Sequence, residues 1–169
     1  MCAFVMQNAA LLLSAEADAV RSMLMEGIRR SLSATAQQLG VSMRELSSTF
    51  ICVLTDGRQY LAAHLGDGAV LAERRGALNV LSFPQNGSSR SRTPLTTMPL
   101  AERYLRICRE SCDDISIIWI MTDGAMAEVF GENYGLAGEK LSLPMIRRRL
   151  SSGCEDDATY GYISWREEP

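Results

Sequence analysis

Three acidic turns hold the residues of this chain that are best suited to metal chemistry. Asp67 lies in a Leu-Gly-Asp-Gly turn and Asp123 in a Met-Thr-Asp-Gly turn, and each turn follows an apolar run typical of a β-strand. Asp156 and Asp157 form a third acidic turn, which precedes the apolar run 160–165. Glycine permits a sharp turn, and a carboxylate at a strand end presents a hard oxygen that suits Mg²⁺ or Mn²⁺ better than zinc.

Each acidic turn, taken alone, is equally typical of an ordinary strand end, because Asp and Gly are among the commonest turn residues. The three turns together allow a second interpretation, in which the strand ends converge on one metal cluster. That interpretation predicts that the carboxylates of Asp67, Asp123 and Asp156 gather at one end of the sheets. Their separations should then run from a few Å to about 8 Å, within reach of one hydrated metal ion.

A long helix is the clearest element that the sequence predicts around these turns. Ser14 is suited to the N-cap, and Glu16 and Asp18 place negative charge in the first turn. Apolar residues at helical spacing then define one buried face: Val20, Met23, Leu24, Ile28, Leu32, Ala36 and Leu39. Gly40 is expected to end the helix. The preceding run 1–13 is too short to cross a bilayer, and we expect a helical extension or a disordered leader.

The rest of the chain is predicted to be rich in strands. The expected strands are 49–55, 59–65, 69–73, 78–82, 104–109 and 115–121. A capping box at Ser42 predicts a short helical turn, 85–100 reads as a loop, and 125–130 and 144–150 as helices. This pattern indicates an α+β fold, with two packed antiparallel sheets and helices outside, in a single domain over 1–169.

Composition excludes several classes of protein. A chain of 169 residues with 47% hydrophobic and 22% charged residues is typical of one soluble globular domain. A net charge of −3 argues against a nucleic-acid binder. The basic run 147–149 is expected to be a solvated helix face, with a phosphate contact as the alternative. No stretch indicates a membrane protein.

The cysteines and the histidine favour structural roles. Five cysteines at scattered spacing do not suggest a disulfide framework, so a reducing cytoplasm is the simplest compartment. Cys52 lies in an apolar run and is expected to be a small core residue. His64 is the only histidine, and no serine at a nucleophile turn accompanies it, so we expect a core or strand-edge position.

The order of these motifs resembles the metal-dependent protein Ser/Thr phosphatases of type 2C. In that family a strand pair ends in Gly-Asp-Ser/Gly, a later strand ends in Ser/Thr-Asp-Gly, and Asp-Asn/Asp-x-Thr precedes the last strand. The segments 83–87 and 93–96 look like an Asn-Gly turn and a Leu-Thr element of the bacterial branch. The resemblance covers roughly 14–165 and implies an α-β-β-α sandwich.

The resemblance also implies a chemistry. Complete members hold two Mn²⁺ or Mg²⁺ ions, and the water between them attacks the phosphate of phospho-Ser or phospho-Thr. It implies that Asp123 and Asp156 are metal ligands. Asp67 would serve a weaker third ion or orient its turn. Asp157 would support the ligands without coordinating, and the neighbouring turn glycines would do the same, namely Gly68 and Gly124.

One departure from the family pattern limits this expectation. The family has an earlier Asp-Gly-x-Gly turn, whose Asp bridges the two metals, and an upstream basic residue that holds the phosphate. Residues 1–13 contain no Asp, Gly, Arg or Lys. We therefore expect a type 2C domain without its N-terminal strands, in which no residue has an assigned catalytic role. Metal binding is expected to be limited to one ion or none.

Two functional hypotheses follow from this departure. In the first, the protein is a Ser/Thr phosphatase whose missing motif lies upstream of this chain. In the second, it is a catalytically silent phosphatase-like module that engages phosphoproteins or a regulatory partner. In either case the missing strands leave an open sheet edge that invites homodimerisation.

Overall fold

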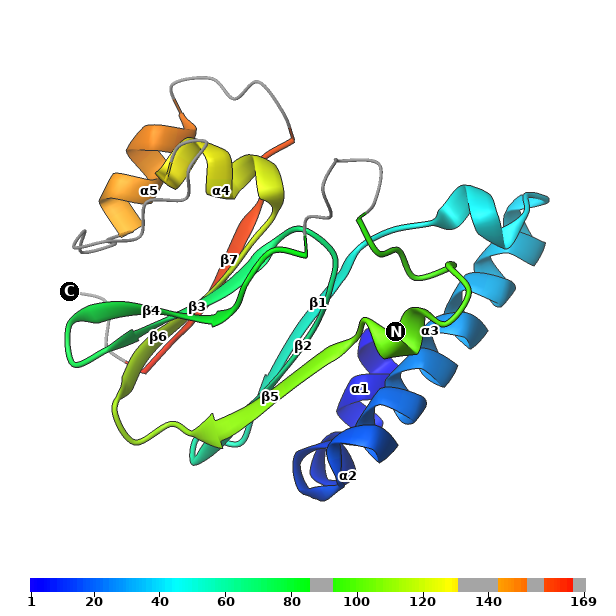
Figure 1. The fold of residues 1–169 in the computed structure, drawn as a ribbon, viewed down its shortest axis with the longest axis horizontal. Coiled ribbons are helices and arrows are strands. Elements are labelled where there is room, and N and C mark those ends of the chain that lie inside the picture. Colours follow the sequence, from blue (N-terminus) through cyan, green and yellow to red (C-terminus); the bar gives the residue numbers. More distant parts are fainter. Residues whose placement is uncertain (86–92, 131–142, 152–156, 166–169) are drawn as a thin grey trace. The chain divides into compact units, whose positions relative to one another are not determined.

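The structure is a computed structural model, which describes residues 1–85, 93–130, 143–151 and 157–165 (Figure 1). The chain has an α+β fold with two antiparallel sheets and helices, which confirms the expected fold class. It divides into two compact units, each built on one sheet. Unit 1 comprises residues 1–66 and 85–111, and unit 2 comprises residues 67–84 and 112–169.

Unit 1 holds a three-stranded sheet in the order β1-β2-β5. Its strands are β1 (Phe50–Thr55), β2 (Gln59–Leu65) and β5 (Arg106–Ser111). The β1–β2 hairpin turns at Asp56, whose carboxylate accepts the N–H groups of Arg58 and Gln59 at 2.9 Å each. Such an Asx turn is a sequence-encoded way of closing a hairpin.

The expected strand 104–109 was wrong by two residues at its start. A short 3₁₀ helix, η3 (Ala101–Arg103), comes immediately before it. The N–H groups of Tyr104 and Leu105 donate to the carbonyl of Ala101 at 3.0 and 3.2 Å, so both residues still belong to the helical turn. Pairing with β2 therefore begins only at Arg106.

The long helix α3 (Ala17–Leu39) ends at Gly40, as predicted, with this glycine in the left-handed conformation at φ 68°. Its predicted N-cap, Ser14, was wrong, since Glu16 occupies that position. Ser14 is instead the last residue of a preceding helix, and its hydroxyl donates to the carbonyl of Ala10 at 2.9 Å. A hydroxyl bound back into one helix cannot cap the next.

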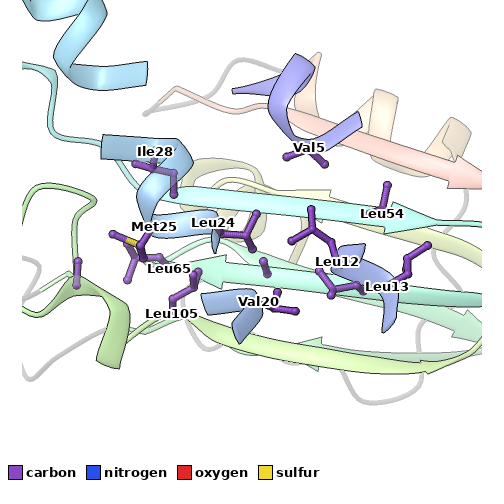
Figure 2. Packing of buried hydrophobic residues seen from close by; sticks show 13 residues of the cluster. Val5, Leu12, Leu13, Val20, Leu24, Met25, Ile28, Leu54, Leu65 and Leu105 are labelled. Carbon is purple, nitrogen blue, oxygen red and sulfur yellow. The ribbon is translucent and has the colours of Figure 1, made fainter. Parts of the chain in front are cut away.

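The residues before α3 form two further helices, α1 (Cys2–Gln7) and α2 (Ala9–Ser14). This agrees with the helical extension rather than the disordered leader. Both helices contribute to the core of unit 1 (Figure 2). Its buried members are Val5, Leu12, Leu13, Val20, Leu24, Met25, Ile28, Leu54, Leu61, Ala63, Leu65, Ala101 and Leu105. The helices thus share one apolar cluster with the sheet. His64 of β2 is also fully buried, but it belongs to the opposite face of the strand from the cluster members Ala63 and Leu65.

Unit 2 holds a four-stranded sheet in the order β4-β3-β6-β7. Its strands are β3 (Ala69–Arg74), β4 (Ala77–Ser82), β6 (Ile115–Met121) and β7 (Tyr160–Ser164). The helices are α4 (Asp123–Phe130) and α5 (Leu143–Leu150). They pack with the sheet in a second cluster of Ala69, Leu71, Trp119, Met121, Ala125, Met126, Val129 and Ile146.

Strand β6 buries apolar side chains on both faces, as its nearly continuous apolar run predicted. Trp119 belongs to the second cluster, whereas Ile118 points to the opposite face, and both side chains are fully buried. Helix α4 begins at Asp123, two residues earlier than expected. Of the basic run 147–149 in α5, Arg147 and Arg148 are exposed, as expected for a solvated helix face, whereas Arg149 is half-buried and donates to the Val129 carbonyl.

The remaining structural predictions concern cysteines and membrane segments. Cys2, Cys52, Cys108 and Cys112 are free thiols, and Cys154 lies outside the described residues. Cys52 is half-buried against the core of unit 1 rather than within it, and burial raises the pKa of its thiol. Within the ranges that the structure describes, none of the helices has the length and apolarity needed to cross a membrane.

We predict that Arg109→Ala destabilises unit 1 through the loss of an anchor for α2. The Arg109 guanidinium donates to the carbonyls of Leu12 and Ala15 at 2.7 Å each, so it caps the C-terminal end of that helix. Losing these charge-assisted bonds should lower the free energy of unfolding by about 2 kcal/mol. Urea denaturation measures the change, and Arg58→Ala, at an exposed arginine of the β1–β2 turn, is the control. Equal effects of the two substitutions would contradict the prediction.

Candidate metal site at one end of the four-stranded sheet

The register of β3 and β6 brings two of the three acidic turns to the same end of the sheet. Ala69, the first residue of β3, pairs with Met121, the last residue of β6. Asp67 lies two residues before Ala69, and Asp123 lies two residues after Met121. Because the strands are antiparallel, the start of β3 and the end of β6 lie at the same end of the sheet (Figure 1).

The third acidic turn reaches the same end through β7. Tyr160, the first residue of this strand, also pairs with Met121, so the segment 157–159 lies beside the end of β6. Asp157 is exposed, whereas Asp67 and Asp123 are half-buried. Asp156 lies outside the described residues, so its expected role as a ligand stays a prediction.

Thr122 joins the second and third acidic turns. Its backbone N–H donates to the carbonyl of Thr159 at 3.0 Å, and its hydroxyl oxygen accepts the N–H of Thr159 at 2.9 Å. The hydroxyl proton faces the carbonyls of Asp157 and Thr159, each at 3.3 Å. The same oxygen lies 3.4 Å from the N–H of Ala125, the third residue of α4, which is the geometry of an N-cap. One side chain therefore fixes both Asp123 and the turn before β7.

Unit 1 fixes the turn that leads into Asp67. Gly66 has φ 124°, and a Cβ atom there would lie 2.4 Å from Cγ2 of Thr49, so only glycine fits. The N–H of Gly66 donates to the Gln85 side-chain oxygen at 2.7 Å, and the N–H of Gln85 donates to the Gly66 carbonyl at 2.8 Å. The Gln85 side-chain amide then donates to the Tyr104 carbonyl at 2.6 Å.

The two glycines that follow the acidic residues are both buried. Gly68 lies directly before β3, and Gly124 lies in the first turn of α4. Their predicted support of the neighbouring aspartates stays a prediction.

The donor chemistry fits a hard divalent cation, although the set of donors is open. Of the residues expected to hold an ion, the described ones are Asp67 and Asp123, whose carboxylate oxygens are the ligands that Mg²⁺ and Mn²⁺ prefer. Across the part of the chain that the structure describes, no group of three or more His, Cys, Asp or Glu side chains is close enough to hold a metal ion. An ion held by one or two carboxylates would keep most of its coordinating waters, as Mg²⁺ commonly does.

Thr122 and Gln85 are the positioning residues that the sequence interpretation missed. Thr122 had a recognisable signal, since a Thr before Asp-Gly at the start of a predicted helix is a typical N-cap. Gln85 had none, because its bonds to Gly66 span 19 residues of sequence. Contacts of that range depend on the tertiary fold.

The amino-acid sequence matches the family described as Protein phosphatase 2C over residues 1–158. This chain belongs to the protein phosphatase 2C family. The match covers both units, including the acidic turns at Asp67 and Asp123 and the described part of the third. Among curated proteins, none matches the sequence at a significant level.

Solved structures of bacterial phosphatases share the fold. A bacterial serine phosphatase superposes with a TM-score of 0.59 at 10% identity, covering 88% of this chain and 68% of that one. PppA of Pseudomonas aeruginosa, a regulatory component of its T6SS, gives 0.55 at 19% identity, covering 89% and 70%. The Ser/Thr phosphatase Stp1 of Staphylococcus aureus gives 0.56 at 11% identity, covering 91% and 70%.

Family and fold together make this chain a Ser/Thr phosphatase-like domain. The recognised resemblance to type 2C phosphatases is thereby confirmed. Members of the protein phosphatase 2C family are metal-dependent, so the acidic end of the four-stranded sheet is the natural place to test for an ion.

We predict that Thr122→Val loosens the junction between α4 and β7, whereas Thr122→Ser preserves it. Valine keeps the shape of threonine but lacks the hydroxyl that contacts the amides of Ala125 and Thr159. Both amides should exchange with solvent faster in the valine variant, and the lost cap should cost about 1 kcal/mol of stability. Amide hydrogen exchange followed by NMR measures this effect. Equal exchange rates in the serine and valine variants would contradict it.

Proposed function

We propose that this chain is the metal-binding part of a protein Ser/Thr phosphatase that hydrolyses phosphomonoesters. The observation that carries the proposal is the convergence of the Asp67 and Asp123 turns at one sheet end, in a member of a metal-dependent phosphatase family. The residues proposed to hold the ion are Asp67, Asp123 and Asp156. Gly68, Gly124 and Asp157 support them without coordinating.

The proposed cofactor is Mn²⁺ or Mg²⁺. When bound, such an ion would supply a water of lowered pKa as the nucleophile toward a phosphate monoester. The chain's own contribution is to hold the carboxylates in position. Thr122 fixes Asp123 to the start of α4, and Gln85 fixes the backbone at Gly66, next to Asp67.

The second candidate function is a catalytically silent module that binds phosphoproteins. Two observations favour it: the 169 residues contain no Asp-Gly-x-Gly run, and the described residues provide no three-ligand cluster. Both candidates share a phosphoprotein as substrate or partner. Cytoplasmic localisation, a single domain over 1–169 and homodimerisation through an open sheet edge remain further parts of the proposal.

We predict that the chain binds one divalent ion weakly or none at all. The bridging carboxylate of the family is absent from these residues, so the remaining carboxylates share no common ligand. Calorimetric titration with Mn²⁺ should give a stoichiometry of one or less, and Asp123→Asn should abolish any binding. Asp18→Asn, at an exposed residue of α3, is the control. Two tightly bound ions would show that another residue replaces the bridging carboxylate.

We predict that the 169-residue chain hydrolyses p-nitrophenyl phosphate very poorly, even in excess Mn²⁺. Catalysis by two metals needs both ions around one water, and misplacement by about 1 Å can cost about a hundredfold in rate. Joining an upstream segment that carries Asp-Gly-x-Gly should raise the rate by orders of magnitude, and Asp123→Asn should then remove the gain. Steady-state kinetics measures both changes.

The opposite kinetic result would revise one part of the proposal. Robust Mn²⁺-dependent turnover by the chain alone, lost in Asp123→Asn, would show that the site is complete without the upstream motif. Persistent inactivity after the motif is joined would favour the silent binding module.

A further inference from the structure

Unit 1 contains a pocket whose volume is about 730 Å³, remote in sequence from the acidic turns. It is formed by Arg29 of α3, by the 3₁₀ helix η1 (Met43–Leu46) with the following Ser47, and by the segment 93–99. Two arginines line it, Arg29 from α3 and Arg44 from η1. No carboxylate is among the described residues that line it. The volume falls within the range of small-ligand sites.

The guanidinium of Arg44 keeps its charge available to a ligand. Its sequence neighbour Glu45 is held by the capping box of η1, where its carboxylate accepts the N–H and the hydroxyl of Ser42 at 2.9 and 2.8 Å. These two hydrogen bonds lower the pKa of the Glu45 carboxyl below its ordinary value, so Glu45 stays ionised at Ser42. Among the described residues, Arg44 forms no side-chain hydrogen bond or ion pair.

Arg29 has an ion-pair partner that a bound phosphate would have to displace, but this ion pair is weak. Its guanidinium lies 3.4 Å from the Glu102 carboxylate, and both side chains are about half exposed, at 49% and 45%. An exposed ion pair of this length contributes little free energy, because water screens it. A ligand phosphate with two negative charges can displace such a carboxylate.

Backbone and hydroxyl contacts hold the pocket wall in place. The N–H of Thr96 donates to the Ser48 carbonyl at 2.9 Å, and the N–H of Ser48 donates to the Thr96 hydroxyl at 3.2 Å. The hydroxyls of Ser47 and Thr97 are also hydrogen-bonded to each other. The segment after residue 93 is therefore tied to the end of η1, and a preformed wall lowers the entropy cost of binding.

The lining is apolar beside the arginines. Met43, Leu95 and Met98 contribute to it, and Met98 is 40% exposed. Methionine side chains adapt to partners of different shape. An arginine pair next to an adaptable apolar surface suits a phosphorylated side chain carried by a peptide better than a bare anion.

We propose that this pocket binds the phosphate monoester of a phosphorylated peptide, with Arg29 and Arg44 as the phosphate ligands. The proposal deepens the proposed function, on which its choice of a phosphoprotein partner rests. Arginine forks match phosphate geometry bidentately. The pocket thus provides a docking site for phosphoproteins whether or not the acidic turns are catalytic.

The test is a titration of the full chain with a fluorescein-labelled peptide that holds one phosphothreonine flanked by leucine and methionine. EDTA is present, so binding cannot depend on a metal. We expect saturable anisotropy, and an affinity about tenfold weaker in Arg44→Ala and in Arg29→Ala. Arg44→Lys should lie between wild type and Arg44→Ala, because lysine keeps the charge but loses the fork.

The matched control is Arg30→Ala. Arg30 neighbours Arg29 on α3, but its guanidinium pairs with Glu26 at 2.7 Å and does not line the pocket. The Arg30→Ala variant should bind the phosphopeptide with an affinity within about twofold of that of the wild type. The unphosphorylated peptide should bind at least tenfold more weakly than the phosphopeptide. Circular dichroism melts establish that each variant is folded.

Several outcomes would overturn the proposal. Absence of phosphopeptide binding, or equal losses in Arg30→Ala and Arg44→Ala, would exclude the arginine pair as a specific site. Binding that is insensitive to Arg44→Ala but lost in Asp123→Asn would assign the peptide to the acidic turns. If inorganic phosphate competes at the same concentration as the peptide, the pocket binds the phosphate group alone and does not recognise the peptide. Since no metal or turnover is involved, these outcomes are independent of the kinetic test of the proposed function.

Discussion

The pairing of β6 with its two neighbours is the constraint on which the acidic end of unit 2 depends. Met121 pairs with Ala69 on one side and with Tyr160 on the other, so three strand ends are held level. A register slip of one residue would turn every side chain of a strand to the other face of the sheet. It would also shift the acidic turn of that strand out of line with the other two turns. Packing makes such a slip costly. Trp119 is fully buried, and its ring centroid lies 6.3 Å from that of Tyr160 and 5.2 Å from that of Tyr162.

The strand register sets the position of the turns, whereas local hydrogen bonds set their orientation. Thr122 contacts the first turn of α4 and the backbone before β7, so a single hydroxyl couples two acidic turns that are separated by more than 30 residues. Within unit 1, the side-chain oxygen of Gln85 accepts the N–H of Gly66 and so holds the backbone of that turn. Both residues act on the backbone next to the carboxylates, which is how polar side chains support a site without belonging to it.

The proposed phosphatase and the proposed binding module differ in what they demand of the carboxylates. Catalysis needs a closed set of ligands, whereas recognition of a phosphate needs only cations and donors. The described carboxylates form an open set. The arginine pocket of unit 1 offers two cations, of which Arg29 has a long ion pair with Glu102, and its described lining residues include no carboxylate. Phosphoprotein recognition therefore has support that does not depend on the completeness of the metal site.

The sequence by itself determined the local features of the fold, because they depend on neighbouring residues. The left-handed Gly40, the capping box at Ser42 and the bounds of β2 and β6 were all predicted correctly. The errors arose where a local signal had a competitor nearby. Ser14 had a preceding helix to bond to, and η3 delayed the start of β5.

Only the tertiary structure decided which strands pair, and in what order. The sheet order β4-β3-β6-β7 joins segments far apart in the chain, and it brings the Asp67 and Asp123 turns to the same end of the sheet. The tertiary structure also decided where the N-terminal helices pack. Their apolar residues did not indicate a packing partner in the sequence, and the structure places them in the core of unit 1. Acidic turns are encoded in a few consecutive residues, but their convergence depends on long-range register, which sequence periodicity does not specify.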